Sequence, residues 1–259
     1  MKLIVRSRNV SCAPLKEIET PFPVIFRMGS TTPTNEITRR RNPIEINSAE
    51  ACRISGNKIL MKEALVKAGC STAEYFTLTE VDRNKIQEYL AEFGVIIAKR
   101  VNSSKGKGIY LIENDEGIDD FLSEIRNDSI EKYIFEKFYK YSREYRLHIT
   151  KEGCFYAARK MLKHDAQVRW HRHAENSVWF KEENPLFRKP DNWGIIVEDC
   201  IKGLNAIGLD IGAFDVKVQT TDKNPKYIIL ESNSAPALGE IGIQKYKDML
   251  TKMIQDVKV

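Results

Sequence analysis

The sequence lacks the features that mark secreted, membrane-spanning and fibrous proteins. Its five cysteines are scattered, odd in number and never spaced as C-x-x-C, which excludes a disulfide framework and predicts free thiols in a reducing compartment. The opening MKLIVRSRNV has an apolar run of only three residues before Arg6, too short for a signal peptide, and no window approaches the length of a membrane span. We therefore expect a cytoplasmic protein without a membrane partner.

Glycine and proline are also scarce, and the sequence has no internal repeat or low-complexity tract. With 14 Gly, 9 Pro, 42% hydrophobic and 30% charged residues, the 259-residue chain is typical of a globular protein and not of a disordered or fibrous one. The net charge of +5 suits anionic ligands in general, whether nucleotides, nucleic acid or carboxylates. A chain of this length can build one large domain or a pair of small lobes.

Apolar periodicity predicts strands and helices in mixed order. Helical spacing marks 55–69, 82–94, the segment that follows Asp115, and 193–204. Strand-like runs are KLIVR, PVIFRMG, VIIAKRV, GIYLIE, YIFEKF, EYRLHI, CFYAARKML, AFDVKVQ and YIILESN. This order predicts an α+β fold with antiparallel hairpins and not a regular βαβ succession.

Two carboxylates stand at matching points of the last predicted hairpin. Asp215 and Glu231 each lie eight residues from Lys223 in the turn-like TDKNPK, so a hairpin centred there places them opposite each other. In that register, the other face of the hairpin is a core layer of Phe214, Val216, Val218, Ile228 and Leu230.

A metal ion would explain why two like charges face each other. Facing carboxylates repel unless a cation lies between them, and a strand places Asn233 on the same face as Glu231. Carboxylate and carboxamide oxygens without His or Cys favour a hard ion, with Mg²⁺ bridging to a phosphate the leading choice. The alternative is a shifted register in which both acids are solvated.

The segment AKRVNSSKGKG has the composition of an anion-binding loop. Lys99 ends a predicted strand, and the small polar residues that follow include Ser103, Ser104 and Lys107. Their N–H groups could wrap anionic oxygens, although the spacing is not that of a Walker A loop and the segment joins two strands. A solvated hairpin tip is the alternative.

The segment FEKFYKYSREYRLHI carries two further carboxylates. Glu136 could accept a hydrogen bond from the amine of adenine, the backbone of Lys137 and Phe138 could pair with the ring edge, and Glu144 could hold ribose hydroxyls. The alternative for Glu144 is a surface ion pair with Arg146.

These motifs, in this order from about Ser55 to about Gly239, resemble those of the ATP-grasp proteins. The resemblance implies an α+β ATP-grasp fold, in which two lobes with antiparallel sheets clamp ATP. It divides the chain into a short N-terminal region (1–55), a central lobe with a glycine-rich loop (56–130) and a C-terminal lobe with a metal site (131–259). The short leader and the E-x-R pattern are similar to RimK-type glutamate ligases and D-alanine ligase relatives.

The resemblance also implies roles for individual residues. One or two Mg²⁺ ions, with Mn²⁺ as an alternative, would be held by Asp215, Glu231 and Asn233. ATP would be bound by Lys58, Lys99, Ser103, Ser104, Lys107, Glu136, Lys137, Phe138 and Glu144. Positive groups that stabilise the transition state would be Arg146, Arg159 and Lys217, with Arg169 and Asn176 as further candidates.

The implied activity is that of an ATP-dependent carboxylate-amine ligase. Such an enzyme forms an amide or peptide bond through an acyl phosphate, from a small-molecule or peptide carboxylate and an amine. The alternatives are an ATP-grasp phosphotransferase (kinase), a nucleotide-binding regulator without turnover, and a basic nucleic-acid-binding protein in which Trp170 stacks on bases. We expect no nucleic-acid partner, and a homo-oligomer stays open.

Two segments depart from the pattern of the family. The N-terminal region is shorter than a typical substrate domain, and its Arg27 and the run 39–41 could bind a carboxylate or simply be solvated. The segment KHDAQVRWHRHAEN gathers His164, His171 and His173 with two arginines. We expect a cationic substrate loop near the γ-phosphate there, because the spacing fits no standard zinc site, which is the alternative.

Overall fold

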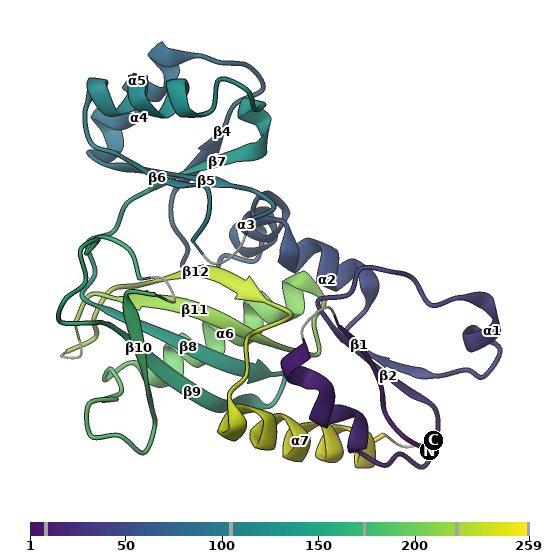
Figure 1. Ribbon diagram of the computed structural model, residues 1–259. Coiled ribbons are helices and arrows are strands. Elements are labelled where there is room, and N and C mark those ends of the chain that lie inside the picture. Colours follow the sequence, from purple (N-terminus) through teal and green to yellow (C-terminus); the bar gives the residue numbers. More distant parts are fainter. Residues whose placement is uncertain (8–9, 104–105, 173–174, 221–222, 258–259) are drawn as a thin grey trace.

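The computed structural model describes residues 1–7, 10–103, 106–172, 175–220 and 223–257. Its strands form three sheets, of three, four and five strands, and helices pack against each of them (Figure 1). The two larger sheets are antiparallel throughout. The predicted α+β fold with antiparallel sheets is therefore confirmed.

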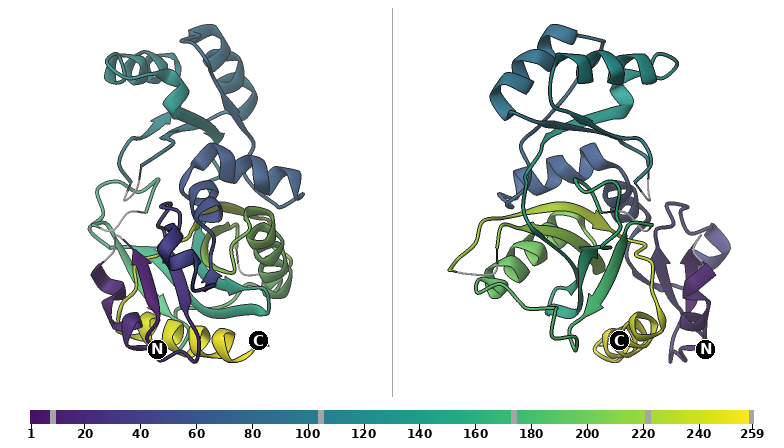
Figure 2. Two further views of the ribbon diagram at one scale, coloured as in Figure 1. Left: turned by 90° about the vertical axis from the view of Figure 1, so that its right-hand side faces the viewer. Right: turned by 60° about the vertical axis from the view of Figure 1, so that its left-hand side comes forward.

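The N-terminal region is a small parallel sheet that shares a core with the last helix, α7 (Glu240–Gln255). Buried side chains such as Leu15, Phe26 and Leu250 fill this core. Figure 2 shows the sheet and α7 at the end of the molecule opposite the central lobe. The elements of this region are β1 (Ile4–Ser7), the 3₁₀ helix η1 (Val10–Glu17), β2 (Val24–Met28), α1 (Glu36–Arg39), β3 (Ile44–Ile46) and α2 (Ala49–Gly56).

Side-chain hydrogen bonds of Asn47 connect this region to the C-terminal lobe. It is fully buried with φ of 62°, and its side chain donates to the carbonyls of Arg27 and Ile211 and accepts from the N–H groups of Asp210 and Ile211. Asparagine tolerates this left-handed conformation better than most residues. Buried Arg27 bonds Thr34 and pairs with Glu45, so it is part of this framework and not an open carboxylate site.

The central lobe is a four-stranded sheet in the order β4-β7-β5-β6, with α4 and α5 on one face. In its core, Phe76 stacks on Phe135, and Phe121 contacts Phe135 edge to face. The predicted helix limits hold for α4, since Asp82 caps its first turn and Gly94 ends it with φ of 77°. The elements are β4 (Tyr75–Thr77), α4 (Arg83–Phe93), β5 (Ile96–Arg100), β6 (Ile109–Ile112), α5 (Asp115–Glu124), η2 (Ile130–Lys132) and β7 (Tyr133–Lys137). The preceding helix, α3 (Lys58–Lys67), packs through Met61 and Leu65 into the core of the C-terminal lobe.

The C-terminal lobe is a five-stranded sheet in the order β10-β9-β8-β11-β12, covered on one face by α6. Because side chains alternate along a strand, residues such as Leu147, Phe214 and Val216 pack against α6, while their neighbours point to the opposite face. The elements are β8 (Arg143–Thr150), β9 (Gly153–Leu162), β10 (Ser177–Lys181), α6 (Trp193–Ile207), β11 (Ile211–Val218) and β12 (Tyr227–Asn233).

The segment 70–75 joins the two larger lobes. Thr72 forms a parallel bridge with Ile229, whose N–H donates to the carbonyl of Ser71 at 2.7 Å. The chain then enters β4 of the central sheet. Among the described residues, no helix has both the length and the apolar character needed to cross a bilayer.

Candidate functional site

Asp215 and Glu231 face each other across β11 and β12, as the sequence predicts. Asp215 is buried and Glu231 is partly buried, and both lie on the face of the sheet turned away from α6. A β-bulge follows at once, because Val216 pairs with Ile229 and Leu230 is left as an extra residue. The predicted core layer with Ile228 and Leu230 is thus wrong: Ile229 packs with Val216, and Ile228 lies opposite Lys217.

We call the face that carries these acids the cleft face. It bears charged side chains from four strands. They are Glu144 and Arg146 on β8, Lys160 on β9, Asp215 and Lys217 on β11, and Glu231 on β12.

The pKa values of the two acids are shifted in opposite directions. Arg146 donates to both oxygens of Asp215, through Nε at 2.6 Å and a terminal nitrogen at 2.7 Å. Although burial favours the neutral form, this guanidinium lowers the pKa of Asp215. Burial and the Asp215 carboxylate raise the pKa of Glu231, and the ammonium groups of Lys58 and Lys99 partly offset that rise. Asn233 donates to Glu231 at 3.3 Å, which completes the predicted oxygen set.

The lysines of the central lobe and α3 lie across from this set. Lys58 donates to the carbonyl of Ser103 at 2.6 Å, which connects the first turn of α3 to the loop after β5. Lys99 bonds one oxygen of Glu136 at 2.6 Å, and Lys62 lies 3.4 Å from the other. Both oxygens of Glu136 therefore face lysines, and this placement does not support the expected contact with an adenine amine.

Lys62 is the residue that sequence reasoning missed. Its side chain is wholly buried and also donates to Thr72 at 2.7 Å, so it links Glu136 to the segment between the lobes. Burial lowers the pKa of Lys62, and the Glu136 carboxylate opposes this shift. Its position four residues after Lys58, one turn along the same helix face, is the signal that could have revealed it.

The turn after β7 differs from expectation in its backbone. The N–H of Lys137 donates to Glu74 and that of Phe138 to Val95, both at 2.9 Å, so these donors are used inside the lobe and do not face a ligand. Lys217 lies against this turn, with Nζ 4.7 Å from the Phe138 ring centre and 3.4 Å from the carbonyl of Tyr139. Burial lowers the pKa of Lys217 to about 8.

Glu144 is buried and not part of a surface pair. Lys160 lies 3.3 Å and Arg172 3.4 Å from its carboxylate, and Lys217 is opposite it on β11. The alternative of an exposed pair with Arg146 is wrong, because Arg146 is committed to Asp215.

Arg159 lies on the other face of the sheet. It pairs with Tyr145 in the β8–β9 register, so it points to the α6 side, whereas Lys160 points to the cleft face. This placement does not support a role for Arg159 at the phosphates. Trp179 on β10 was not predicted either: its ring centre is 4.9 Å from the Arg146 guanidinium and 5.3 Å from Lys160 Nζ.

The remaining candidates lie in connecting segments. The glycine-containing loop joins β5 and β6 in an antiparallel hairpin, as predicted. The hydroxyl of Ser103 donates to the carbonyl of Arg100, and Lys107 is exposed. Ser104 falls outside the described residues. His173 also falls outside them, and His164 is exposed. Within the described ranges, no group of three or more His, Cys, Asp or Glu is placed to hold a metal.

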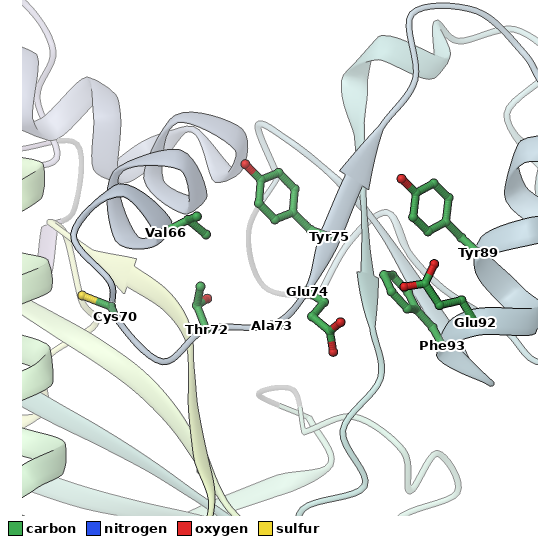
Figure 3. Close-up of a pocket in the computed structure, with 9 residues that line it drawn as sticks. All are labelled: Val66, Cys70, Thr72, Ala73, Glu74, Tyr75, Tyr89, Glu92 and Phe93. Atoms are coloured by element: carbon green, nitrogen blue, oxygen red, sulfur yellow. The ribbon is translucent and has the colours of Figure 1, made fainter.

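A pocket of about 420 Å³ lies behind the segment between the lobes and away from the acid pair (Figure 3). Its walls come from the end of α3, from 70–75 and from α4, with Tyr75 and Tyr89 among the lining side chains. The cleft face contributes none of its lining residues.

Comparison with known proteins identifies the fold. No family model matches the sequence, and no curated protein matches it either. Among solved structures, the ATP-grasp ligase PsnB with a minimal precursor aligns with a TM-score of 0.59 and 13% identity over 88% of this chain and 78% of that one. The D-alanine–D-alanine ligase of Bacillus anthracis gives 0.64 and 11% over 90% and 76%.

Biotin carboxylase from Campylobacter jejuni, in an ATP-analogue complex, also aligns, with a TM-score of 0.64 and 16% identity over 91% of this chain and 55% of that one. The chain therefore has the ATP-grasp fold, as the order of its motifs predicts.

Proposed function

We propose that this chain, on its ATP-grasp fold, is an ATP-dependent carboxylate-amine ligase that forms an amide or peptide bond through an acyl phosphate. The observation that carries the proposal is the pair of Asp215, which is buried, and Glu231, which is partly buried; they face each other, with Lys58 and Lys99 close to Glu231. Buried like charges are costly unless a cation and its anionic ligand complete the site. Neighbours of the same fold are ligases, solved with ATP or with Mg and ADP.

The oxygen set fits magnesium. Two carboxylates and a carboxamide, without sulfur or imidazole, match the ligand preference of Mg²⁺, with Mn²⁺ as the alternative. Asp215, Glu231 and Asn233 would hold one or two ions, which neutralise phosphate charge when bound. We assign Arg146, which donates to both oxygens of Asp215, to the reacting phosphate, because this contact holds its guanidinium next to the proposed metal ligands.

The nucleotide would lie between the two lobes. We assign its phosphates to Lys58, Lys99 and the loop that holds Ser103, Ser104 and Lys107. Its ribose and base would lie near Glu144, Lys217 and the turn at Phe138, since these side chains lie farther along the same strands. Glu136 and Lys62 then act as positioning residues that hold Lys99.

The substrates would meet on the far side of the metal set. The strand register aligns one residue of each of the five strands with the metal ligands. These residues are Lys181, Ala158, Arg146, Asp215 and Glu231. We propose Lys160, in place of Arg159, as a positive group on the cleft face. We propose a small-molecule or peptide carboxylate and an amine as the substrates, in the cytoplasm.

We propose three parts, as the sequence predicts, but with one boundary moved: β7 lies in the central sheet, so the C-terminal lobe begins after Lys137 and not at residue 131. The first part shares its core with α7, so we expect it to be inseparable from the last.

The deciding experiment measures ADP release with a panel of carboxylates, each with and without amines. A ligase requires both substrates for full turnover, whereas a phosphotransferase requires only one. ADP release that is complete with the acid alone, together with a stable phosphorylated product, would replace the ligase by the kinase.

A further inference from the structure

A second group of cations lies at the Ser142 end of the C-terminal sheet, and two of its three members are on the α6 side. Arg143 and Tyr145 share this face of β8, and Arg159 is opposite Tyr145 on β9, which makes the two arginines diagonal neighbours. Arg172 lies at the same end of the sheet, where it donates to the carbonyl of Ser142 at 2.8 Å. We call Arg143, Arg159 and Arg172 the arginine cluster.

The cluster has almost no negative charge to balance it. Among the described residues, no carboxylate lies within ion-pair distance of Arg143 or Arg159. Arg172 reaches only Glu144, which Lys160 shares. Burial, together with Arg143, Arg172 and Arg188, lowers the pKa of Arg159, as expected for cations crowded without a counter-charge.

The hydrogen-bond donors of the cluster are also unmatched. A terminal nitrogen of Arg143 and the Nε atoms of Arg159 and Arg172 are buried, and none of the three has a hydrogen-bond partner among the described residues. The nearby segment satisfies only part of the need, since Arg159 donates to the carbonyl of Leu186 at 2.6 Å. Buried donors without acceptors cost free energy, and like charges across paired strands repel. A ligand that supplies acceptors and negative charge would remove both costs.

We propose that the arginine cluster binds a doubly charged oxyanion, such as a phosphate group or a dicarboxylate. The guanidinium fork matches the paired oxygens of either group, and two or more guanidinium charges call for more than one negative charge. The aromatic rings of Tyr145, Phe187 and Trp193 form the apolar wall behind the cluster. Arg143 and Arg159 lie on the face opposite the acid pair, whereas Arg172 also contacts Glu144 of the cleft face at 3.4 Å, so the test of this inference uses Arg143 and Arg159.

The test titrates inorganic phosphate, and separately succinate, into the full chain by calorimetry at constant ionic strength and without nucleotide. Wild-type protein is expected to bind at least one of them in preference to chloride. Arg159→Gln and Arg143→Gln should each weaken this binding about tenfold or more, since each removes charge-assisted hydrogen bonds. The relative affinity for phosphate and succinate shows which source of oxyanion the cluster prefers.

Two matched variants control for charge and for the nucleotide lysines. Arg83→Gln removes one positive charge from exposed α4 and is expected to bind as wild type. Lys58→Gln is expected to retain the binding as well. The inference is overturned if neither anion binds, if Arg159→Gln and Arg143→Gln bind as tightly as Arg83→Gln, or if only Lys58→Gln abolishes binding.

A second measurement covers variants that fold poorly. In chloride buffer, Arg159→Gln should leave the midpoint of thermal unfolding unchanged or raise it, because it removes a partly buried cation that repels its arginine neighbours. Added phosphate should then raise the midpoint of wild type and Arg83→Gln more than that of Arg159→Gln. Equal shifts in all three proteins would also overturn the inference.

Discussion

The two faces of the C-terminal sheet are built by the same strands and have opposite chemistry. On the α6 face, Leu147, Phe214 and Val216 are fully buried in an apolar core. On the cleft face, their immediate neighbours Arg146 and Asp215 are nearly as buried, yet charged. Apolar burial stabilises the fold by itself, whereas buried charges do not. The comparison indicates that, at the level of the acid pair, the α6 face maintains the structure and the cleft face is kept for a ligand.

Substitution of either acid should abolish the activity proposed for the cleft face and leave the stability of the protein intact. We expect Asp215→Asn or Glu231→Gln to reduce ATP turnover by at least about a thousandfold, since each removes a ligand of the proposed ion and its charge. The free energy of unfolding should be unchanged or higher for Glu231→Gln, because a repulsion is relieved. ADP-release assays and urea unfolding measure the two effects. A folded Glu231→Gln protein with wild-type turnover would remove the metal assignment.

Substitution of Phe214 should give the reverse result. This side chain is fully buried between β11 and α6, so Phe214→Ala is expected to lower the free energy of unfolding by about 3–5 kcal/mol. The Michaelis constant for ATP should stay within a few-fold of wild type at a temperature where the variant is folded. Urea unfolding and initial-rate kinetics are the measurements. A large rise in that constant, with little loss of stability, would contradict the division between the faces.

A double-mutant cycle sharpens the comparison within the cleft face. Arg146→Ala leaves the Asp215 carboxylate buried without its bidentate partner and should lower the free energy of unfolding by roughly 3 kcal/mol. Addition of Asp215→Asn should restore part of that loss, because the unpaired charge is then gone. Urea unfolding of the four proteins measures the coupling. Additive effects would show that the contact between Arg146 and Asp215 does not contribute to stability.

The smallest expected effect is a pH dependence of ATP use that comes from Lys217, near which we propose the adenine base to bind. The pKa of Lys217 is lowered to about 8, so its ammonium group is present below that pH and lost above it. If it helps to bind the nucleotide, kcat/KM for ATP should fall a few-fold as the pH rises through about 8. Lys217→Met should have the lower value and a flat profile over this range. An unchanged profile in the variant would assign the titration to another group.

The sequence allowed the opposition of Asp215 and Glu231 to be predicted because a short turn fixes the register of a hairpin. The bulge at Leu230 could not be predicted, because a strand with one extra residue contains the same kinds of side chain as a regular strand. The face of Arg159 was mistaken for a related reason. The neighbouring Lys160 has the same charge, and only the β8–β9 register, itself shifted near His148, decides which of the two points to the cleft.

Lys62 shows a second kind of limit. A lysine on a helix is usually exposed, so periodicity alone gives no reason to place it inside the protein. Its burial depends on Glu136 and Thr72, which come from distant parts of the chain and meet it only in the folded structure. The order of the motifs predicted the fold, but the partners of each charge required three-dimensional information.

The central claim is tested most directly by the affinity of a non-hydrolysable ATP analogue, measured by calorimetry with and without Mg²⁺. The account predicts that Mg²⁺ strengthens binding to the wild type at least about tenfold and that Glu231→Gln loses this enhancement while it stays folded. Equal affinity with and without Mg²⁺ in the wild type, or an undiminished enhancement in Glu231→Gln, would contradict the claim that the two facing carboxylates hold the ion that carries the nucleotide.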